Sequence, residues 1–395
     1  MSHLKWRVSP SDQAPCGGGT SRSRPFRKDR SRPRCSPGAS RGGRCGAPVL
    51  LFGVLPMLLS ACRLDVPQPK NLVPAGALPT PVRERGPDGT DRLVCEIRDA
   101  ITVTGNIRIS GIDTLRFVGM GCVNLIDADS QLSIRDCQLE WIIDDSTPAD
   151  YASVLIDGGI LEVENVRSMV TAEVHPALTS GDFAGPPMRA ILRARLAKSV
   201  SVKAFDGLAE GQVPVMFFHS ISPGAGIHVD RVHLRRMGAG IYLENFGTAV
   251  IEDFSAEDCN MSAIVAMAGD SINVDRARVR RQGRLDSRGM TGTGDGMTLD
   301  GIRSAVVRES SFLEGGCYGI SVLGGRMYLQ LIRCELSGGI THAIYSGGAN
   351  SPDLVPDRQL HLEGCRFVGN VGSDCFVVGF GQVELKARGE SDVVR

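Results

Sequence analysis

A pattern of short apolar strands recurs along most of this chain. One strand has the form Gly-apolar-x-apolar, as in Gly240-Ile-Tyr-Leu243, and a second segment, expected to be another strand, has the form apolar-x-x-apolar, as in Ile251 to Phe254. Apolar and polar residues alternate along these strands, which is typical of β-strands with one buried face. No window carries the periodicity of an amphipathic helix. The pattern therefore predicts an all-β domain built from repeated strand pairs.

The second segment can be aligned as a column whose members begin 22 to 33 residues apart. The longer steps fit the same unit with an added loop. A strand pair of this kind cannot bury its inward face alone, so successive units must stack on one another. The pattern predicts a solenoid of about 10 to 12 coils, each lying ~4.8 Å from the next. The segments begin at Ile134, Val163, Leu196, Val229, Ile251, Val274, Val307, Leu331 and Leu362.

On these repeats, residues 92 to 387 resemble the right-handed parallel β-helix superfamily, which has the pectate-lyase-like fold. The resemblance implies a single-stranded right-handed parallel β-helix, and it identifies a fold rather than an enzyme family. Two other folds remain open at this point. A β-sandwich requires antiparallel strands, and a left-handed hexapeptide helix requires a six-residue period.

The N-terminal region has a different composition. Residues 1–45 contain 11 Lys or Arg and 2 Asp or Glu, and the uncharged residues 46–61 include a short apolar core typical of a signal peptide. The core ends in Leu59-Ser-Ala-Cys62, which resembles a bacterial lipobox. The resemblance implies a diacylglycerol on Cys62 and, because Arg63 rather than Asp follows, the outer membrane. The alternative is an ordinary secretory signal with an incidental cysteine.

These features divide the chain into three regions. Residues 1–61 are expected to be a basic leader and signal peptide, residues 62–91 a Pro-rich spacer, and residues 92–395 the β-helix. The whole chain has 44 basic and 44 acidic residues, but residues 62–395 have 33 and 42, a net charge of −9. An acidic exported body argues against nucleic acid as a partner and mildly against a uronate polymer. A polysaccharide or another cell-envelope component is the expected partner.

Three cysteines fall in the column that is expected to face inward. Cys137, Cys334 and Cys365 occupy the fourth position of the apolar-x-x-apolar segment, where valine, phenylalanine and alanine also occur. They are interpreted as small buried hydrophobic residues. Cys334 and Cys365 belong to successive coils, so a disulfide between them is an alternative. No Cys-x-x-Cys pair or local Cys and His cluster occurs, and neither a metal nor a cofactor is predicted.

The insertions in the repeat are expected to lie together. Residues 144–151, 172–190 and 281–294 all follow the second segment and precede the next Gly-apolar-x-apolar strand, so they belong to one corner of the solenoid. The insertion at 346–358 belongs to a different corner. Loops at one corner build a wall, and the face beside such a wall is the usual binding surface.

The segment from Arg276 to Asp300 concentrates charge within this wall. Asp295 and Asp300 are candidates for a catalytic acid/base pair, on either side of a strand whose outward residue is Thr298. The alternative is a Gly-rich loop with solvated arginines, in which Asp295 caps a turn. The candidate substrate-binding residues are Arg280, Arg281, Arg284, Arg288, Tyr242 and Tyr345.

Two classes of function follow. The protein is either a lipid-anchored binding module for polysaccharide or an envelope partner, or a carbohydrate lyase, hydrolase or epimerase. No Gly-His-Gly occurs, and the one Asp-Asp pair, Asp144-Asp145, is far from Asp295 in the sequence. The absence of these motifs of β-helix enzymes favours the binding module.

Overall fold

A computed structural model describes residues 78–86, 88–172, 189–210, 215–283, 294–338, 342–347, 355–369, 377–378 and 380–386. Cys62, Arg284 and Arg288 lie outside the described residues. All regular structure in the described part is β-strand, and no described helix is long and apolar enough to cross a membrane. The fold is a right-handed parallel β-helix.

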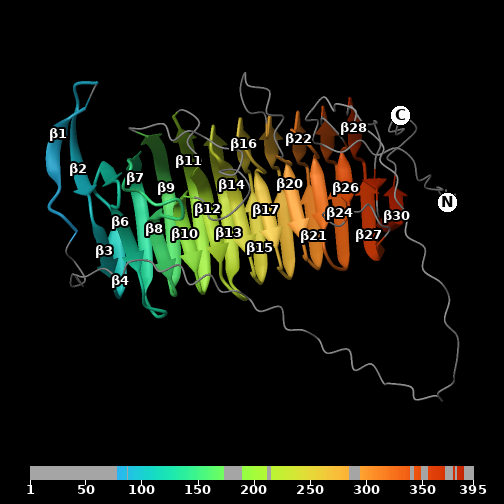
Figure 1. Cartoon of the computed structure of the whole chain (residues 1–395), viewed down its shortest axis with the longest axis horizontal. Helices are drawn as coiled ribbons and strands as arrows, with labels where there is room; N and C mark the ends of the chain where they lie inside the picture. Colours follow the sequence, from blue (N-terminus) through green and yellow to red (C-terminus); the bar gives the residue numbers. More distant parts are fainter. Residues whose placement is uncertain are drawn as a thin grey trace, which may run out of the picture. The chain divides into compact units, whose positions relative to one another are not determined.

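One sheet, here called sheet B, contains one strand from each coil. All its neighbouring strands are parallel, and they lie side by side in chain order in Figure 1. In the described part of the chain its 11 strands give 11 coils, within the predicted range. These strands are β3 (Ala100–Val103), β6 (Cys122–Leu125), β8 (Ala152–Asp157), β10 (Arg189–Arg195), β12 (Val215–Ile221), β14 (Ala239–Glu244), β17 (Ile264–Met267), β20 (Met297–Asp300), β23 (Ile320–Leu323), β26 (Ile344–Ser346) and β29 (Val377–Val378).

The second sheet, which has 19 strands among the residues given above, is bent into two rows, here called row A1 and row A2. Each complete coil passes from A1 through A2 to sheet B. Row A1 contains β4 (Asn106–Ile109), the first halves of β7 (Gln131–Ile143), β9 (Ile160–Ala172), β11 (Ser199–Ala209) and β13 (Gly226–Arg235), then β15 (Thr248–Glu252), β18 (Ser271–Asp275), β21 (Ser304–Arg308), β24 (Met327–Ile332), β27 (Val355–Glu363) and β30 (Phe380–Lys386). Row A2 contains β2 (Asp91–Ile97), β5 (Thr114–Val118), the second halves of β7, β9, β11 and β13, then β16 (Ser255–Glu257), β19 (Arg278–Arg280), β22 (Ser311–Leu313), β25 (Glu335–Ser337) and β28 (Arg366–Val368).

The pairing excludes the β-sandwich. The strand pairs of both sheets are parallel except that β1 (Val82–Arg85) runs antiparallel to β2. Strand β1 comes from the end of the Pro-rich spacer and covers the N-terminal edge of row A2. Leu78 packs against the core beside it, and the Cys95 thiol lies 3.3 Å from the Pro79 carbonyl oxygen. The first coil is therefore partly covered by the spacer.

In the structure, the apolar-x-x-apolar segment is not a strand of its own. It is a bend that joins two strands. Ile251 ends the inward side of β15, Phe254 begins row A2, and Asp253 between them has a φ of 48°. One left-handed residue turns the chain sharply while both apolar neighbours stay buried. The same corner has a left-handed residue in nine coils: Asp136, Asn165, Ala204, Arg231, Asp253, Arg276, Glu309, Arg333 and Gly364.

One member of the expected column is wrong. Leu196 is 65% exposed and occupies the corner between sheet B and row A1. Val202 takes its place, because it pairs with both Val163 and Val229 and is fully buried. The spacing of Leu196 and Ser199 matched the motif, but the side chain of Leu196 points to solvent.

The small residues that open the Gly-apolar-x-apolar strands allow close packing between coils. A Cβ atom at Gly296 would lie 2.5 Å from the carbonyl oxygen of Gly319 in the next coil. The inward residues that follow, such as Ile241, Met297 and Ile320, are fully buried in one continuous core. Each such side chain contributes about 1.5–3 kcal/mol by leaving water. The core is thus a stack of apolar layers, as the repeat predicts.

Candidate functional site

The corner between row A2 and sheet B carries the longest insertions. Residues 144–151 join β7 to β8, and the insertions at 172–190 and 281–294, largely outside the described residues, join β9 to β10 and β19 to β20. The insertion at 346–358 joins β26 to β27 at a different corner. The predicted clustering of loops is confirmed by this strand order. Two outer faces border the corner, that of sheet B and that of row A2.

Outward residues of successive strands form a row on sheet B, and the row includes Thr298. Tyr242, Val265, Thr298, Ser321 and Tyr345 are consecutive partners on β14, β17, β20, β23 and β26. Much of this face is covered. Ser321 is 2% exposed, whereas both tyrosines are half-buried. A long polymer therefore has little direct access to this face.

The same row continues toward the N-terminus with buried polar side chains. Arg193 and His219 are 5% and 6% exposed, and His219 packs edge-on against Tyr242 at a ring distance of 5.2 Å. Burial, reinforced by Arg193 and Arg195, lowers the pKa of His219 to about 3. The imidazole is thus neutral at physiological pH. These residues make a packed layer on sheet B rather than an open surface.

Asp295 lies at the start of β20 and is almost completely buried. One carboxylate oxygen accepts hydrogen bonds from the hydroxyls of Thr298 (3.0 Å) and Ser321 (2.5 Å), and the other accepts the backbone N–H of Tyr318 (3.2 Å). Burial raises the pKa of Asp295 to about 6, although these three donors oppose the increase. Because both oxygens are occupied, Asp295 ties the corner between β22 and β23 to sheet B.

Asp300 lies at the other end of the same strand, two residues beyond Thr298 on the same outer face. It is half-buried and lies against Gly324 of the next coil. Burial raises the pKa of Tyr242 to about 12, and the charges of Glu244 and Asp300 add to this effect. Asp300 therefore helps keep the Tyr242 hydroxyl protonated. The hydrogen-bonding groups of Asp295 come from Thr298, Ser321 and Tyr318 and do not include Asp300.

Three aromatic rings stack beside Asp295. The rings of Tyr318 and Tyr345 are nearly parallel, 4.6 Å apart with an interplanar angle of 12°, and His342 lies 6.1 Å from Tyr318. All three side chains are half-buried. Tyr345 is thus part of an aromatic cluster formed by two coils. The sequence alone did not indicate that Tyr318 and His342 belong to this cluster.

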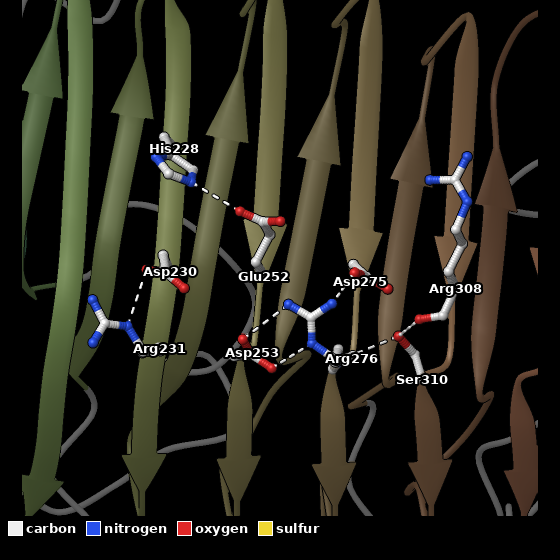
Figure 2. A network of polar contacts seen from close by, with 10 residues as sticks. His228, Asp230, Arg231, Glu252, Asp253, Asp275, Arg276, Arg308 and Ser310 are labelled. Atoms are coloured by element: carbon white, nitrogen blue, oxygen red, sulfur yellow. Dashed lines mark hydrogen bonds and ion pairs between the residues drawn. The ribbon is translucent and has the colours of Figure 1, made fainter.

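The outer face of row A2 is open and carries charge in bands. Successive coils contribute residues of alternating sign at the same positions, so a basic strand lies beside an acidic one. Figure 2 shows part of this order at the A1–A2 corner, where Arg276 of one coil binds Asp253 of the coil before it at 2.7 Å. The bands are Arg231, His233, Arg235 and Arg236; then Asp253, Glu257 and Asp258; then Arg276, Arg278, Arg280 and Arg281; then Glu309 and Glu314.

Two of the four predicted sugar-binding arginines, Arg280 and Arg281, belong to the third band. Arg281 donates to Asp258 at 2.6 and 2.9 Å and also binds Glu257, and hydrogen bonding to Asp258 raises the pKa of its guanidinium. Arg280 lies 3.4 Å from Glu314 in the next coil. Both side chains therefore already have carboxylate partners, and their ion pairs link three successive coils.

A groove with a volume of about 440 Å³ crosses the outer face of row A2 at β7, β9, β11 and β13. Arg167 and Asp206 face one another across adjacent strands with a separation of 4.0 Å, and the His233 ring lies 2.7 Å from the Ser255 hydroxyl. No ion pair forms with Arg235 among the described residues. The groove is lined by Gln138, Arg167, Ser168, Met169, Asp206, Gly207, Leu208, His233 and Arg235.

Sequence reasoning missed this groove, although a signal for it exists. The outward residues of row A2 lie two and four positions after the left-handed residue of each bend. For Asn165 these are Arg167 and Met169, and for Ala204 they are Asp206 and Leu208. Once the bend is recognised, the lining residues can be read from the sequence. His233 is one of these outward residues and is exposed.

No group of three or more His, Cys, Asp or Glu side chains suited to a metal ion occurs among the residues that the structure describes. In the comparisons with known proteins, no family model, curated protein or solved structure matches this chain.

Proposed function

We propose that this protein binds a polysaccharide in the groove on the outer face of row A2. The observation that carries the proposal is an open groove across four parallel strands, where exposed Arg167, Asp206, His233 and Arg235 surround the apolar surface of Met169 and Leu208. Sugar rings offer hydroxyls to polar groups on their edges and C–H surface on their faces. A groove with both kinds of lining suits such a ligand.

The geometry also supports binding over catalysis. Four strands spaced ~4.8 Å apart span roughly 14 Å, a length that accommodates a few sugar units. The charged residues that line the groove are exposed. Asp295, which has the raised pKa of a general acid, lies on sheet B with both oxygens engaged by the protein. A buried carboxyl group whose oxygens are both hydrogen-bonded within the protein has a structural role and does not contact a bound polymer.

Affinity electrophoresis of the full chain against a panel of neutral and acidic polysaccharides tests the proposal. We expect at least one polymer to retard the protein, and His233→Ala to weaken that interaction about tenfold, or about 1.4 kcal/mol. His228→Ala is the matched control, because His228 faces outward on row A1 and pairs with Glu252 outside the groove. Equal losses in both variants, or no binding to any polymer, would refute the groove as the site.

The enzyme alternative has its own readout. The same panel is assayed for release of reducing ends or unsaturated uronate products. We expect no turnover. Product release that is abolished by Asp295→Asn, in a variant that still unfolds cooperatively, would replace the binding module with a carbohydrate-active enzyme acting on sheet B.

We also propose that the mature protein is anchored to the outer membrane through a lipid on Cys62. Such an anchor would hold the groove at the cell envelope. The support is the apolar core followed by Leu59-Ser-Ala-Cys62. Wild-type protein should partition with membranes and carry acyl chains detectable by mass spectrometry, whereas Cys62→Ser should lose both properties. Membrane partition of Cys62→Ser without acyl chains would exclude this anchor.

A further inference from the structure

Two thiols face each other across adjacent coils near the C-terminal end of the β-helix. Cys334 and Cys365 each follow the left-handed residue of the A1–A2 bend, Arg333 in one coil and Gly364 in the next. The flanking strands are in register, with Leu331 opposite Leu362 on one side of the bend. On the other side, Glu335 lies opposite Arg366. The two cysteines are therefore directly opposite each other.

The backbone is tied on both sides of this pair. The Arg333 N–H donates to the Glu363 carbonyl at 2.7 Å, and the Arg366 N–H donates to the Cys334 carbonyl at 2.8 Å. Neighbouring parallel strands place opposite Cα atoms ~4.8 Å apart. Disulfides usually span about 4.4 to 6.8 Å between Cα atoms. The chain thus holds the two residues at a separation that a disulfide can bridge.

Both side chains point into the interior at this corner. Cys334 is 2% exposed, with its sulfur 3.4 Å from the carbonyl oxygens of Val307 and Ile332. Cys365 is half-buried, and its sulfur lies 3.4 Å from the Leu331 carbonyl oxygen. A hydrogen bond between the two thiols raises the pKa of Cys334 and lowers that of Cys365. The more accessible sulfur is also the one that ionises more readily.

We propose that Cys334 and Cys365 are a disulfide-forming pair that cross-links the last two A2 strands, β25 and β28, when the protein meets a small-molecule disulfide such as oxidised glutathione. The Cys365 thiolate attacks one sulfur of the oxidant, forms a mixed disulfide and displaces one thiolate. Cys334 then attacks the Cys365 sulfur and displaces the second small thiol. The protein loses two protons and two electrons, and the oxidant takes them up and becomes two thiols.

Cys95, Cys137 and Cys259 lack this arrangement. Cys137 occupies the same column, but its partner in the next coil is Val166. The Cys95 thiol contacts a backbone carbonyl of the spacer, and the Cys259 thiol lies near the Glu257 carbonyl. Cys137 is therefore the natural control, because it is a buried thiol at the same bend with no cysteine opposite it.

The test exposes the folded full chain to a series of glutathione buffers and maps non-reduced peptides by mass spectrometry. We expect one peptide pair joined through Cys334 and Cys365, lighter by two hydrogen atoms than the reduced peptides, and a rise in Tm of about 5 °C on oxidation. Cys137→Ser should retain the cross-link, and either Cys334→Ser or Cys365→Ser should lose it.

Free, alkylatable Cys334 and Cys365 in folded wild-type protein after equilibration in the most oxidising buffer would overturn the proposal. Wild-type peptide mapping does not depend on any variant folding, so the result stands if a serine substitution destabilises the coil. Hydrogen exchange gives a second readout. Amides of β28 should exchange about tenfold more slowly after oxidation, and unchanged exchange with an intact cross-link would refute its effect on the terminal coils.

Discussion

The outer faces of sheet B and row A2 border the same corner of loops, but they differ in how their polar residues are used. On sheet B, Asp295, Ser321 and His219 are nearly inaccessible. On row A2, Arg167, Asp206 and His233 are exposed around a groove. The comparison shows that a polar row on a β-helix can be an inner layer of the structure. The solvent exposure of the polar side chains, rather than the number of polar residues, distinguishes the face that can bind a ligand.

The same contrast occurs within row A2. Arg236 and Arg281 have similar left-handed conformations at one corner, with φ values of 56° and 54°. Asp258 lies in the coil between them, and its two oxygens bind Arg281. No ion pair forms with Arg236 among the described residues. An arginine-rich segment is therefore a poor guide to a binding site until the charges of the coils on either side are known.

Titration of Asp295, which is buried on sheet B, should produce the largest change in the free energy of unfolding. Burial raises its pKa from 3.8 to about 6, so the folded state holds the proton more tightly than the unfolded state between these values. The free energy of unfolding of the wild type, relative to Asp295→Asn, should fall by about 3 kcal/mol in total as pH rises from about 3 to about 7, with most of the fall between pH 4 and 6. Urea denaturation across this pH range measures it.

The control for this titration is Ser321→Ala, which removes a hydrogen-bond donor to the carboxylate and should move the midpoint to higher pH. If the difference in the free energy of unfolding between wild type and Asp295→Asn does not change with pH, Asp295 is accessible to water. The contrast between the two faces would then be lost.

Glycine-to-alanine substitutions should give the second largest difference in stability between sheet B and row A2. In Gly296→Ala the new Cβ meets the Gly319 carbonyl at 2.5 Å, so the coils must separate, and we expect a loss of about 2 kcal/mol. In Gly207→Ala, on row A2, the nearest atom is the side-chain Cδ2 of Leu234 at 2.9 Å, which can move. Its cost should stay below about 1 kcal/mol. Thermal unfolding compares them, and similar losses would contradict tighter packing on sheet B.

The smallest expected difference is between the two corner arginines. Arg281→Ala should lower the free energy of unfolding by about 1 kcal/mol, because Asp258 and Glu257 lose a shared partner. Arg236→Ala should change it by less than about 0.5 kcal/mol. Urea denaturation at low and high salt checks both values. The difference should shrink at high salt, and an equal effect at both positions would remove the distinction between the charge bands.

Much of the fold follows from local patterns in the sequence. Inward residues such as Val163 and Cys334 could be identified because every coil repeats the same spacing around one bend. The error at Leu196 arose because the spacing alone does not show which way a side chain points. The corner that carries the loops was also predictable, since insertions occur between the same two segments in several coils.

The candidate site was less predictable. Arg281 was selected for its arginine-rich neighbourhood, but its partners Glu257 and Asp258 are more than twenty residues away in the sequence and meet it only through stacking. The lining of the groove comes from four coils in the same way. Asp295 was recognised as chemically distinctive, but two of the three groups that bind it, Tyr318 and Ser321, are more than twenty residues away and only the fold brings them to it.

The sequence by itself determined the repeat, the buried column and the corner where the chain lengthens, because these depend on hydrophobic spacing within one coil. Tertiary structure alone decided which charges neutralise each other, which outer face stays open and which thiols meet. These properties depend on the register between coils. Register brings residues 20 to 40 positions apart to within a strand spacing of ~4.8 Å, where a charge or a sulfur can act on its neighbour.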